Sequence, residues 1–372
     1  MPPSPSPAIV CRRAFISGAV ASLATLSVSG QAKPAFAAPE VDMLAIQVVV
    51  DAATFGPFLD DIDRPGLHVD RHVGAAPVTA DGHMSKKALW GEFGLSLLAS
   101  SKMGDETRRI LIDFGYTPEA LANNVALLGI DPDQIDATVL SHGHLDHYGG
   151  FPGLFANAPA RARHIPFVVG GEEAFCNRIA MTAKPPLIMG ALDRTALAQA
   201  GFAVEIRPEP SVVAGQAFTT GIIPLQTTER AAIPTAMRPG EGCKVTDLSE
   251  AKRLAEQAAD DGEHELATCY NVKGLGLVVI VSCGHRGVLN SIRRAQAISG
   301  VQKIHAVVGG FHLVKPRTEA EAKATAAAMV EIAPDYIIPM HCTGEVFITE
   351  ATRLMPDKVI RPFVGNRLIF AA

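Results

Sequence analysis

Residues 141–150, Ser-His-Gly-His-Leu-Asp-His-Tyr-Gly-Gly, constrain the fold of this chain more than any other segment. Three histidines and one aspartate fall within six positions, a spacing that matches neither a helix face nor the alternation of a strand. The apolar run at 135–140 predicts a short buried strand, so the polar group follows its carboxyl end. Imidazoles with one carboxylate suit zinc, manganese or iron. We therefore expect a metal site in which His142 and His144 face one point and Asp146 and His147 face a second point nearby.

Later segments repeat the order of strand, histidine-bearing loop and helix. Apolar strands are predicted at 276–282, 305–308 and 336–339, and they are followed by His285, His312 and His341. An earlier predicted strand, 109–115, carries Asp113 near its end. Open α/β sheets bind ligands at the carboxyl ends of their strands. We therefore expect these side chains to converge on the loop at 142–147.

These segments resemble the metallo-β-lactamase superfamily, through the strand ending at Asp113, the His-x-His-x-Asp-His motif and the strand-end histidines. One branch is similar in its downstream motifs, the branch named for 7,8-dihydropterin-6-methyl-4-(β-D-ribofuranosyl)-aminobenzene-5'-phosphate synthase. These motifs are Asn-Val-Lys-Gly at 271–274, Cys-Gly-His-Arg-Gly at 283–287, Gly-Gly-Phe-His-Leu at 309–313 and His-Cys-Thr-Gly at 341–344. The resemblance implies an α/β fold, a four-layer αβ/βα sandwich with two facing mixed β-sheets and metals at one edge between them.

The resemblance also implies a set of metal ligands. His142 and His144 would bind one metal, and His285 is the candidate for its remaining histidine. The second metal would be held by Asp146, His147 and His341. The cofactor is then a divalent metal, one or two ions, with zinc as the leading candidate and iron or manganese as ions that suit the same donors.

The chain departs from the superfamily at the bridging carboxylate. Many members place an aspartate at the end of the strand that resembles 276–282. Here the strand ends in Ser282, and Cys283, Gly284 and His285 follow without an acid. Either Cys283 or His285 takes this place, or the second metal is held weakly, or water alone bridges the ions.

Four further residues are assigned roles around the metals. Asp113 is expected outside the ligand set, where it would accept the free N–H of a metal-bound imidazole, and a capping role for the following helix is compatible with this. Cys283 is likewise expected outside the set of histidine and aspartate ligands, in the wall of the site. Asp146 and His312 are the candidate catalytic groups, Asp146 to orient or deprotonate water and His312 to contact substrate or transfer a proton. His264 is interpreted as structural.

The first 37 residues have the features of a twin-arginine signal peptide, with Arg12-Arg13 before an apolar stretch and Ala35-Phe36-Ala37 as a cleavage site. The segment carries three basic residues and no acidic one, so its removal changes the formal net charge from −5 to −8. We expect a periplasmic or secreted protein, delivered by the twin-arginine export machinery. No basic run offers a nucleic-acid surface, and no stable membrane insertion is expected after cleavage.

Residues 38–372 are expected to form one metallo-β-lactamase-like domain. The region at about 155–260 is either a cap over the site or a long insertion with its own small core, and helices are predicted at 171–180 and 248–260. Five cysteines remain after cleavage, and their spacing does not give a disulfide pairing.

The leading functional hypothesis is an exported metal-dependent enzyme that acts on a small-molecule substrate through a metal-bound hydroxide or a Lewis-acid metal. It would be a hydrolase, or a transferase similar to the synthase branch. One alternative is iron-dependent thiol oxidation, and another is a non-catalytic metal-binding protein of the cell envelope. The substrate, the choice among these reactions and the oligomeric state stay open at this point.

Overall fold

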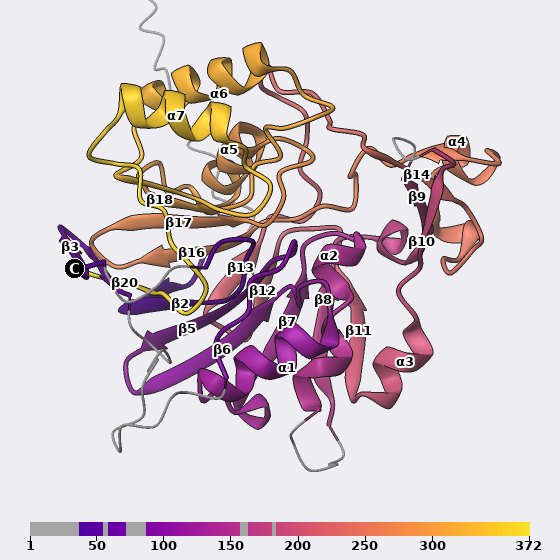
Figure 1. Ribbon diagram of the computed structural model, residues 1–372, viewed down its shortest axis with the longest axis horizontal. Helices are drawn as coiled ribbons and strands as arrows, with labels where there is room; N and C mark the ends of the chain where they lie inside the picture. Colours follow the sequence, from indigo (N-terminus) through magenta and orange to yellow (C-terminus); the bar gives the residue numbers. More distant parts are fainter. Residues whose placement is uncertain (1–36, 55–58, 72–86, 157–162, 181–183) are drawn as a thin grey trace, which may run out of the picture. The chain divides into compact units, whose positions relative to one another are not determined.

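Two large β-sheets face each other across the main core in this computed structural model (Figure 1). The structure describes residues 37–54, 59–71, 87–156, 163–180 and 184–372, all within the unit Pro34–Ala372. The predicted signal segment therefore lies outside the described residues except for Ala37.

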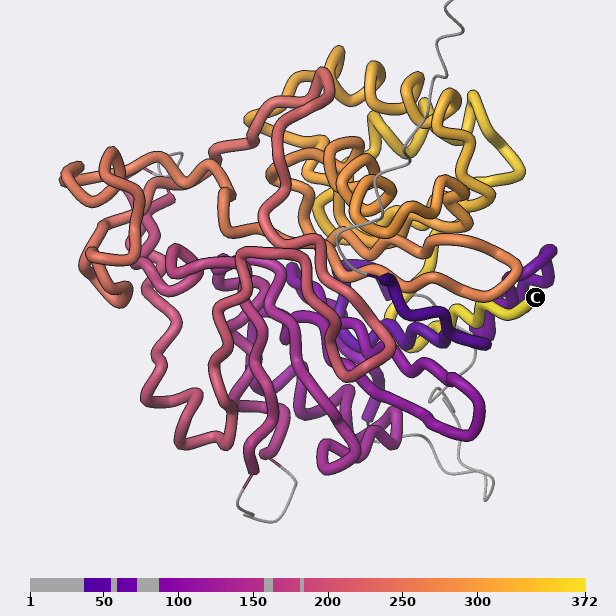
Figure 2. The backbone as a smooth tube through the Cα atoms, turned by 180° about the vertical axis from the view of Figure 1, so that it is seen from behind, coloured from indigo at the N-terminus to yellow at the C-terminus, as the bar shows by residue number. Residues whose placement is uncertain are grey.

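The first large sheet has nine strands among the described residues, in the order β11-β8-β7-β6-β5-β2-β20-β4-β3. Its strands are β2 (Met43–Val50), β3 (Ile62–Arg64), β4 (Leu67–Asp70), β5 (Ser96–Met103), β6 (Glu106–Ile112), β7 (Ala137–Leu140), β8 (Ile165–Val169), β11 (Phe202–Ile206) and β20 (Arg367–Ala371). Figure 2 shows the C-terminal β20 beside the N-terminal β2, with which it pairs in antiparallel register. The sheet is mixed, because β6, β7, β8 and β11 run parallel.

The second large sheet follows the order β12-β13-β16-β17-β18-β19, and β1 pairs with β16. Its strands are β1 (Glu40–Val41), β12 (Ser211–Val213), β13 (Ala217–Thr219), β16 (Thr268–Val272), β17 (Gly276–Val281), β18 (Ile304–Gly309) and β19 (Tyr336–Pro339). Strands β16 and β17 form an antiparallel hairpin. Strands β17, β18 and β19 are parallel, so their carboxyl ends share one edge.

Seven α-helices and four 3-10 segments accompany these strands in the described part. The helices are α1 (Pro118–Leu127), α2 (Leu145–Tyr148), α3 (Arg194–Gln199), α4 (Glu250–Arg253), α5 (Val288–Ser299), α6 (Glu319–Ile332) and α7 (Glu345–Leu354). The 3-10 segments are η1 (Pro132–Gln134), η2 (Phe151–Phe155), η3 (Glu172–Phe175) and η4 (Val245–Asp247).

The alternation of apolar side chains along the strands builds a core on each face of each sheet. In β2, Leu44 and Ile46 enter the core between the two sheets, whereas Val49 enters the outer core beneath α1 and α3. A third core lies between the second sheet and α5, α6 and α7. Each fully buried leucine or isoleucine contributes roughly 1.5–3 kcal/mol relative to exposure. The predicted four-layer αβ/βα sandwich is confirmed.

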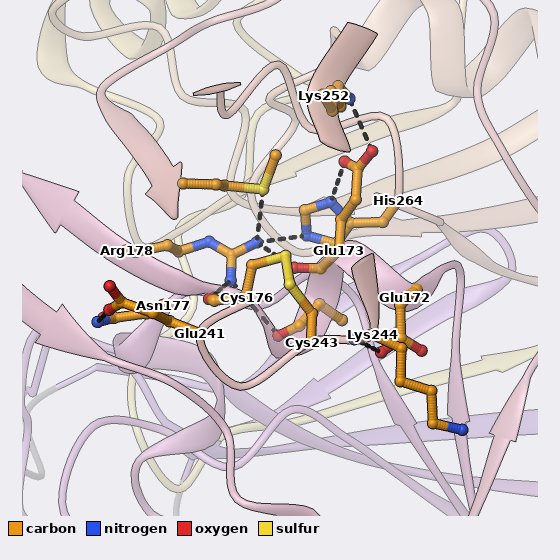
Figure 3. Close-up of a disulfide and its surroundings, with 12 residues drawn as sticks. Glu172, Glu173, Cys176, Asn177, Arg178, Glu241, Cys243, Lys244, Lys252 and His264 are labelled. Atoms are coloured by element: carbon orange, nitrogen blue, oxygen red, sulfur yellow. Dashed lines mark hydrogen bonds and ion pairs between the residues drawn. A yellow bond between two sulfur atoms is a disulfide. The ribbon is translucent and has the colours of Figure 1, made fainter. Parts of the chain in front are cut away.

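A small third sheet, β10-β9-β14-β15, lies to the right in Figure 1. It consists of β9 (Asn177–Ala180), β10 (Leu187–Gly190), β14 (Thr235–Arg238) and β15 (Ala258–Ala259). A disulfide joins Cys176, just before β9, to Cys243 (Figure 3). The region at 155–260 thus contributes strands to all three sheets.

Two predicted helices are wrong. The segment 171–180 forms η3 and then β9, because β9 pairs with both β10 and β14, and this tertiary pairing outweighs local helix propensity. The segment 248–260 is helical only in α4 and ends as β15. No helix within the described ranges is long and apolar enough to span a bilayer.

Candidate metal centre

The histidine-rich loop leaves the carboxyl end of β7 and enters the short helix α2. Two glycines of the loop lie too close to other backbone for any side chain. A Cβ on Gly143 would lie 2.1 Å from the carbonyl oxygen of Ala174, and one on Gly150 would lie 2.0 Å from that of Phe114. The glycines therefore allow the loop to pack directly on neighbouring backbone while its polar side chains turn inward.

Asp146, His147 and His341 bring three ligand atoms together, and we call this group the second subsite. The Nε2 atom of His341 lies 3.2 Å from Nε2 of His147 and 3.3 Å from Oδ2 of Asp146. The remaining pair, His147 Nε2 and Asp146 Oδ2, is 3.6 Å apart. Ligand atoms on a tetrahedral ion with bonds of about 2.0–2.1 Å are about 3.3–3.4 Å apart. The three atoms therefore fit one divalent ion.

The second subsite is supported by residues at the ends of core strands. Asp113, which follows β6 and is fully buried, accepts a 2.7 Å hydrogen bond from Nδ1 of His147. That bond leaves Nε2 of His147 free for a metal. Asp51, which follows β2, accepts the backbone N–H of His341 at 2.9 Å. Asp113 thus lies where the sequence placed it.

His142, His144 and His285 form the first subsite. Their ring centroids are 4.5, 4.6 and 4.8 Å apart. Ser141 Oγ lies 3.0 Å from Nδ1 of His142, and the carbonyl of Ala232 accepts from Nδ1 of His285 at 3.3 Å. Both Nε2 atoms are buried and have no hydrogen-bond partner within the described residues. Buried nitrogens without partners are costly, and a metal ion would satisfy both.

His144 is oriented by residues of the small sheet. Its Nε2 donates to Oδ2 of Asp260 at 2.8 Å, which leaves Nδ1 for the metal. Thr235 Oγ1 and Arg178 Nε each donate to the same carboxylate oxygen at 2.8 Å. Arg178 is only 1% exposed, and its guanidinium also donates to the carbonyls of Glu173 and Cys176. The segment linked by the disulfide is thereby connected to His144 through the side chains of Arg178 and Asp260.

A second chain of contacts holds the backbone of the loop, and Figure 3 shows its members His264, Glu173 and Lys252. The N–H of Gly143 donates to Nε2 of His264 at 3.1 Å. His264 also contacts Oε2 of Glu173 at 3.4 Å, and Lys252 donates to Oε1 of Glu173 at 2.8 Å. His264, which the sequence left as structural, therefore positions the loop that carries the metal candidates.

Cys283 lies between the two subsites. Its Sγ is within 4.8 Å of the ligand atoms of His142 and His285 in one group and of His147 and His341 in another. It also lies 3.4 Å from Nδ1 of His312 and 3.2 Å from Sγ of Cys342. His312 also lies at the site, where its ring centroid is 4.3 Å from that of His285.

Burial and neighbouring charge favour neutral His142 and His285 and an ionised Asp146. Burial, reinforced by the neighbouring histidines, holds the pKa of His142 and of His285 well below the usual value. Burial would raise the pKa of Asp146, but His147 and His341 outweigh it and lower that pKa below its ordinary value. Metals bind neutral imidazole and carboxylate, so these three donors are in the protonation state that a divalent ion requires.

Three site residues adopt positive φ although they are not glycine. Asp113, His312 and His341 have φ of 57°, 43° and 49°, and each directly follows or lies close to a strand end. Such conformations cost about 1–3 kcal/mol and cluster at functional sites. The backbone therefore turns sharply at these ends to direct the three side chains into the centre.

The structure brings together every predicted site residue, namely Asp113, His142, His144, Asp146, His147, Cys283, His285, His312 and His341. Sequence reasoning missed Asp260 and Arg178, and it missed the supporting role of His264. The available signal was the polar run Asp-Asp-Gly-Glu-His-Glu at 260–265, which is unusual directly before a buried strand.

Comparison with known proteins agrees with this geometry. Residues 96–169 match the model of the metallo-β-lactamase superfamily. A crystal structure described as a metal-dependent hydrolase of the β-lactamase superfamily superposes with a TM-score of 0.62 at 21% identity, covering 87% of this chain and 98% of that chain. The chain therefore has the metallo-β-lactamase fold, and its matched segment and strand-end residues are similar to those of that superfamily.

The chain is also similar to a curated synthase. The 7,8-dihydropterin-6-methyl-4-(β-D-ribofuranosyl)-aminobenzene-5'-phosphate synthase of Methanocaldococcus jannaschii is 27% identical over 284 residues, which are 73% of this chain and 90% of that protein. An uncharacterized protein of the same organism is 25% identical over 268 residues, covering 72% and 90%.

Proposed function

We propose that this chain is a metal-dependent enzyme that binds two divalent ions and hydrolyses an ester, lactone, amide or phosphoester bond of a small molecule. The observation that carries the proposal is the second subsite, where three ligand atoms from Asp146, His147 and His341 lie 3.2–3.6 Å apart. The Nε2 atoms of His142 and His285, which have no hydrogen-bond partner among the described residues, supply donors for the ion of the first subsite.

When bound, a divalent cation supplies Lewis-acid polarisation of a carbonyl or phosphoryl oxygen and lowers the pKa of water. Asp146, kept ionised by its two histidine neighbours, has the charge needed to orient a water molecule or accept its proton. His312 has a buried Nε2 without a partner in the described part and can donate or accept a proton there.

Phe93 supplies an apolar contact at the mouth of the centre. Its side chain is 63% exposed, and its ring centroid lies 5.0 Å from the His341 ring. An exposed aromatic side chain beside polar ligands is typical of small-molecule sites, where apolar surface binds the substrate body. This supports a substrate with an apolar or planar group next to the reacting bond.

Group transfer is the second candidate, because the similarity to a synthase covers 73% of this chain. In that reaction an arylamine would take the place of water. A third candidate, iron-dependent oxidation of a small thiol, draws on Cys283 and Cys342 beside the histidines. A non-catalytic metal-binding role in the cell envelope is the fourth.

One set of assays separates these functions. Elemental analysis of protein purified without added metal should find about two zinc ions per chain, whereas iron would favour thiol oxidation. The zinc protein should release p-nitrophenol from a phosphodiester or an ester, or open a lactone. Turnover that depends on an added arylamine, with release of pyrophosphate, would instead indicate transfer. Full metal content with no turnover of any of these substrates would favour the binding protein.

We further propose export to the periplasm or beyond by the twin-arginine route, on the basis of Arg12-Arg13 and the Ala35-Phe36-Ala37 site. A variant with both arginines replaced by lysine should accumulate as an uncleaved cytoplasmic precursor. Cleavage near Ala37 and normal delivery of this variant would point to the general export route, and an uncleaved membrane-bound product would show that the segment is an anchor.

A further inference from the structure

We propose that the Sγ atom of Cys283 is a metal ligand shared by both subsites, in the place where a carboxylate would otherwise join two ions. This inference rests on the proposed two-ion centre and adds a donor to it. The sequence lacks an acid after the strand β17, where Ser282 is followed by Cys283 and Gly284.

The position of Cys283 between the two subsites supports a shared role. A ligand shared by two ions must lie within reach of the donors of both. The Sγ atom of Cys283 forms one group with His142 and His285 and another with His147 and His341, and within each group all ligand atoms are within 4.8 Å of one another. Zinc–sulfur and zinc–nitrogen bonds of about 2.3 and 2.0–2.1 Å place two such donors about 3.6 Å apart on a tetrahedral ion.

The neighbouring nitrogens point to the same conclusion independently. Nε2 of His142 and Nε2 of His285 are buried without a hydrogen-bond partner in the described ranges, and both side chains are only 1% exposed. The sulfur is likewise buried, with Cys283 2% exposed. With Cys283, the first subsite has a thiolate and three imidazoles, and the second has a thiolate, two imidazoles and a carboxylate; both mixed donor sets suit zinc.

Coordination by the cysteine has a defined proton balance. The thiol proton of Cys283 leaves as the metal–sulfur bond forms, and it is released to solvent, since metals bind the thiolate. No oxidant is needed. The adjacent Cys342, whose Sγ is 3.2 Å away, is assigned to neither ion.

Cobalt(II) titration of the whole chain tests the assignment, because cobalt–thiolate bonds give an intense near-ultraviolet charge-transfer band that nitrogen and oxygen ligands do not give. The wild type should bind two cobalt ions and show the band with each. Cys283→Ser should lose it. Cys283→Asp should regain two-ion binding without the band. Cys342→Ala should keep it, as should the control Cys269→Ala, whose thiol belongs to none of the candidate metal groups in the described part.

Sharing is tested in proteins that retain one subsite each. Asp146→Asn should leave the first subsite and His142→Ala the second, and both single-ion proteins should still show the band. A band in only one of them would mean that Cys283 serves one ion and would overturn the proposal. These two variants retain Cys283, so the test holds even if the Cys283 variants do not fold.

The outcomes separate this inference from the proposed function. Two bound cobalt ions without a sulfur band would overturn the role of Cys283 and leave the metal-dependent enzyme standing. Failure of the wild type to bind any metal would overturn both. A sulfur band in a protein that is inactive on every substrate would overturn the enzyme alone. Denaturing alkylation and peptide mass spectrometry should find Cys283 and Cys342 as free thiols, and a disulfide between them would overturn the ligand role.

Discussion

The two subsites of the metal centre differ in what holds their ligands. In the second subsite, His147 is fixed by Asp113 at the end of β6, and the backbone of His341 is fixed by Asp51 at the end of β2. In the first subsite, His144 is fixed by Asp260, which follows β15 of the small sheet, and Asp260 is in turn held by Arg178 of β9. One subsite therefore depends on the central strands and the other on a segment linked by a disulfide.

The difference indicates how the centre can be tuned. Asp113 and Asp51 directly follow β6 and β2, which are packed between the core that separates the two large sheets and the outer core beneath α1 and α3, where movement disturbs the whole fold. The small sheet is a lighter support, because β15 has only two residues and β9, β10 and β14 have four each. We therefore expect the ion of the first subsite to be the more sensitive of the two to changes outside the metal ligands.

The largest effect should follow removal of a ligand from either subsite. Asp146→Asn and His142→Ala should each leave about one metal ion per chain and lower turnover by on the order of 10³-fold, because a Lewis-acid ion is worth several kcal/mol in the transition state. Metal analysis and steady-state kinetics on folded protein check this. The exposed capping residue Asp131 is the matched control, and Asp131→Asn should retain both ions and full turnover. A double variant of Asp146 and His142 with full metal content and activity would refute the site.

The next effect should separate the two subsites directly. Asp260→Asn should weaken metal binding about 10–100-fold, the usual cost of losing a partner behind a metal-bound histidine. Measured by titration, the loss should appear in the Asp146→Asn background, which retains the first subsite, and be absent in the His142→Ala background. Asp261→Asn is the neighbouring control, because Asp261 pairs with Lys252 and Arg286 rather than with His144. Equal losses in both backgrounds would contradict the comparison.

The sequence could predict the second subsite because its information is local. The His-x-His-x-Asp-His spacing marks the loop, and Asp113 and His341 are recognisable as polar residues directly after apolar strands. The predicted apolar strands indicated the edge on which these residues meet, and the resemblance to the superfamily implied the two facing sheets. His285 and His312 were predicted to lie at the centre for the same reason, because each follows a predicted apolar strand.

The support of the first subsite could not be predicted in this way. Asp260 lies 116 residues from His144 and 82 from Arg178 along the chain. Residues 171–180 have a helix-like pattern, and only pairing with β10 and β14 makes β9 a strand. The disulfide between Cys176 and Cys243 spans 67 residues, and cysteine spacing carries no information on such a pair. Contacts of this kind depend on tertiary pairing, which leaves no periodic trace.

Removing the disulfide should test the dependence on the small sheet. The double variant Cys176→Ser, Cys243→Ser should lose about 2–4 kcal/mol of unfolding free energy. Because Cys176 and Arg178 are joined by a hydrogen bond from Nη1 to the carbonyl of Cys176, metal affinity should fall several-fold in the Asp146→Asn background. The His142→Ala background should show little change in affinity. Denaturant unfolding and metal titration measure the two quantities, and Cys269→Ala serves as the control. A drop in stability with unchanged affinity in both backgrounds would show that the disulfide does not support the first subsite.

The smallest effect concerns Lys252, which pairs with Glu173, Asp261 and Glu263 at 2.7–2.9 Å. Burial raises the pKa of Glu173, but His264 and Lys252 outweigh it and hold that pKa below the ordinary value of 4.5. A carboxyl group with a lowered pKa in the folded state stabilises the fold above its unfolded pKa, and this stabilisation disappears as the pH falls through the folded pKa. Lys252→Met should therefore cost roughly 1–3 kcal/mol near pH 7.

This cost should shrink as the pH is lowered below about 4.5, when Glu173 becomes protonated in both proteins. Denaturant unfolding of the wild type and Lys252→Met at a series of pH values measures the difference. Arg253→Met, on the same helix α4, is the control. The Arg253 side chain is 43% exposed, and its ion pair with Glu250 is long at 3.9 Å. Such surface pairs contribute about 0–1 kcal/mol. Since the side chain of Glu173 contacts His264, which holds only the backbone N–H of Gly143 in the loop as described, metal affinity should change less in Lys252→Met than in Asp260→Asn. An equal or larger change would mean that backbone support, rather than orientation of His144, controls the first subsite.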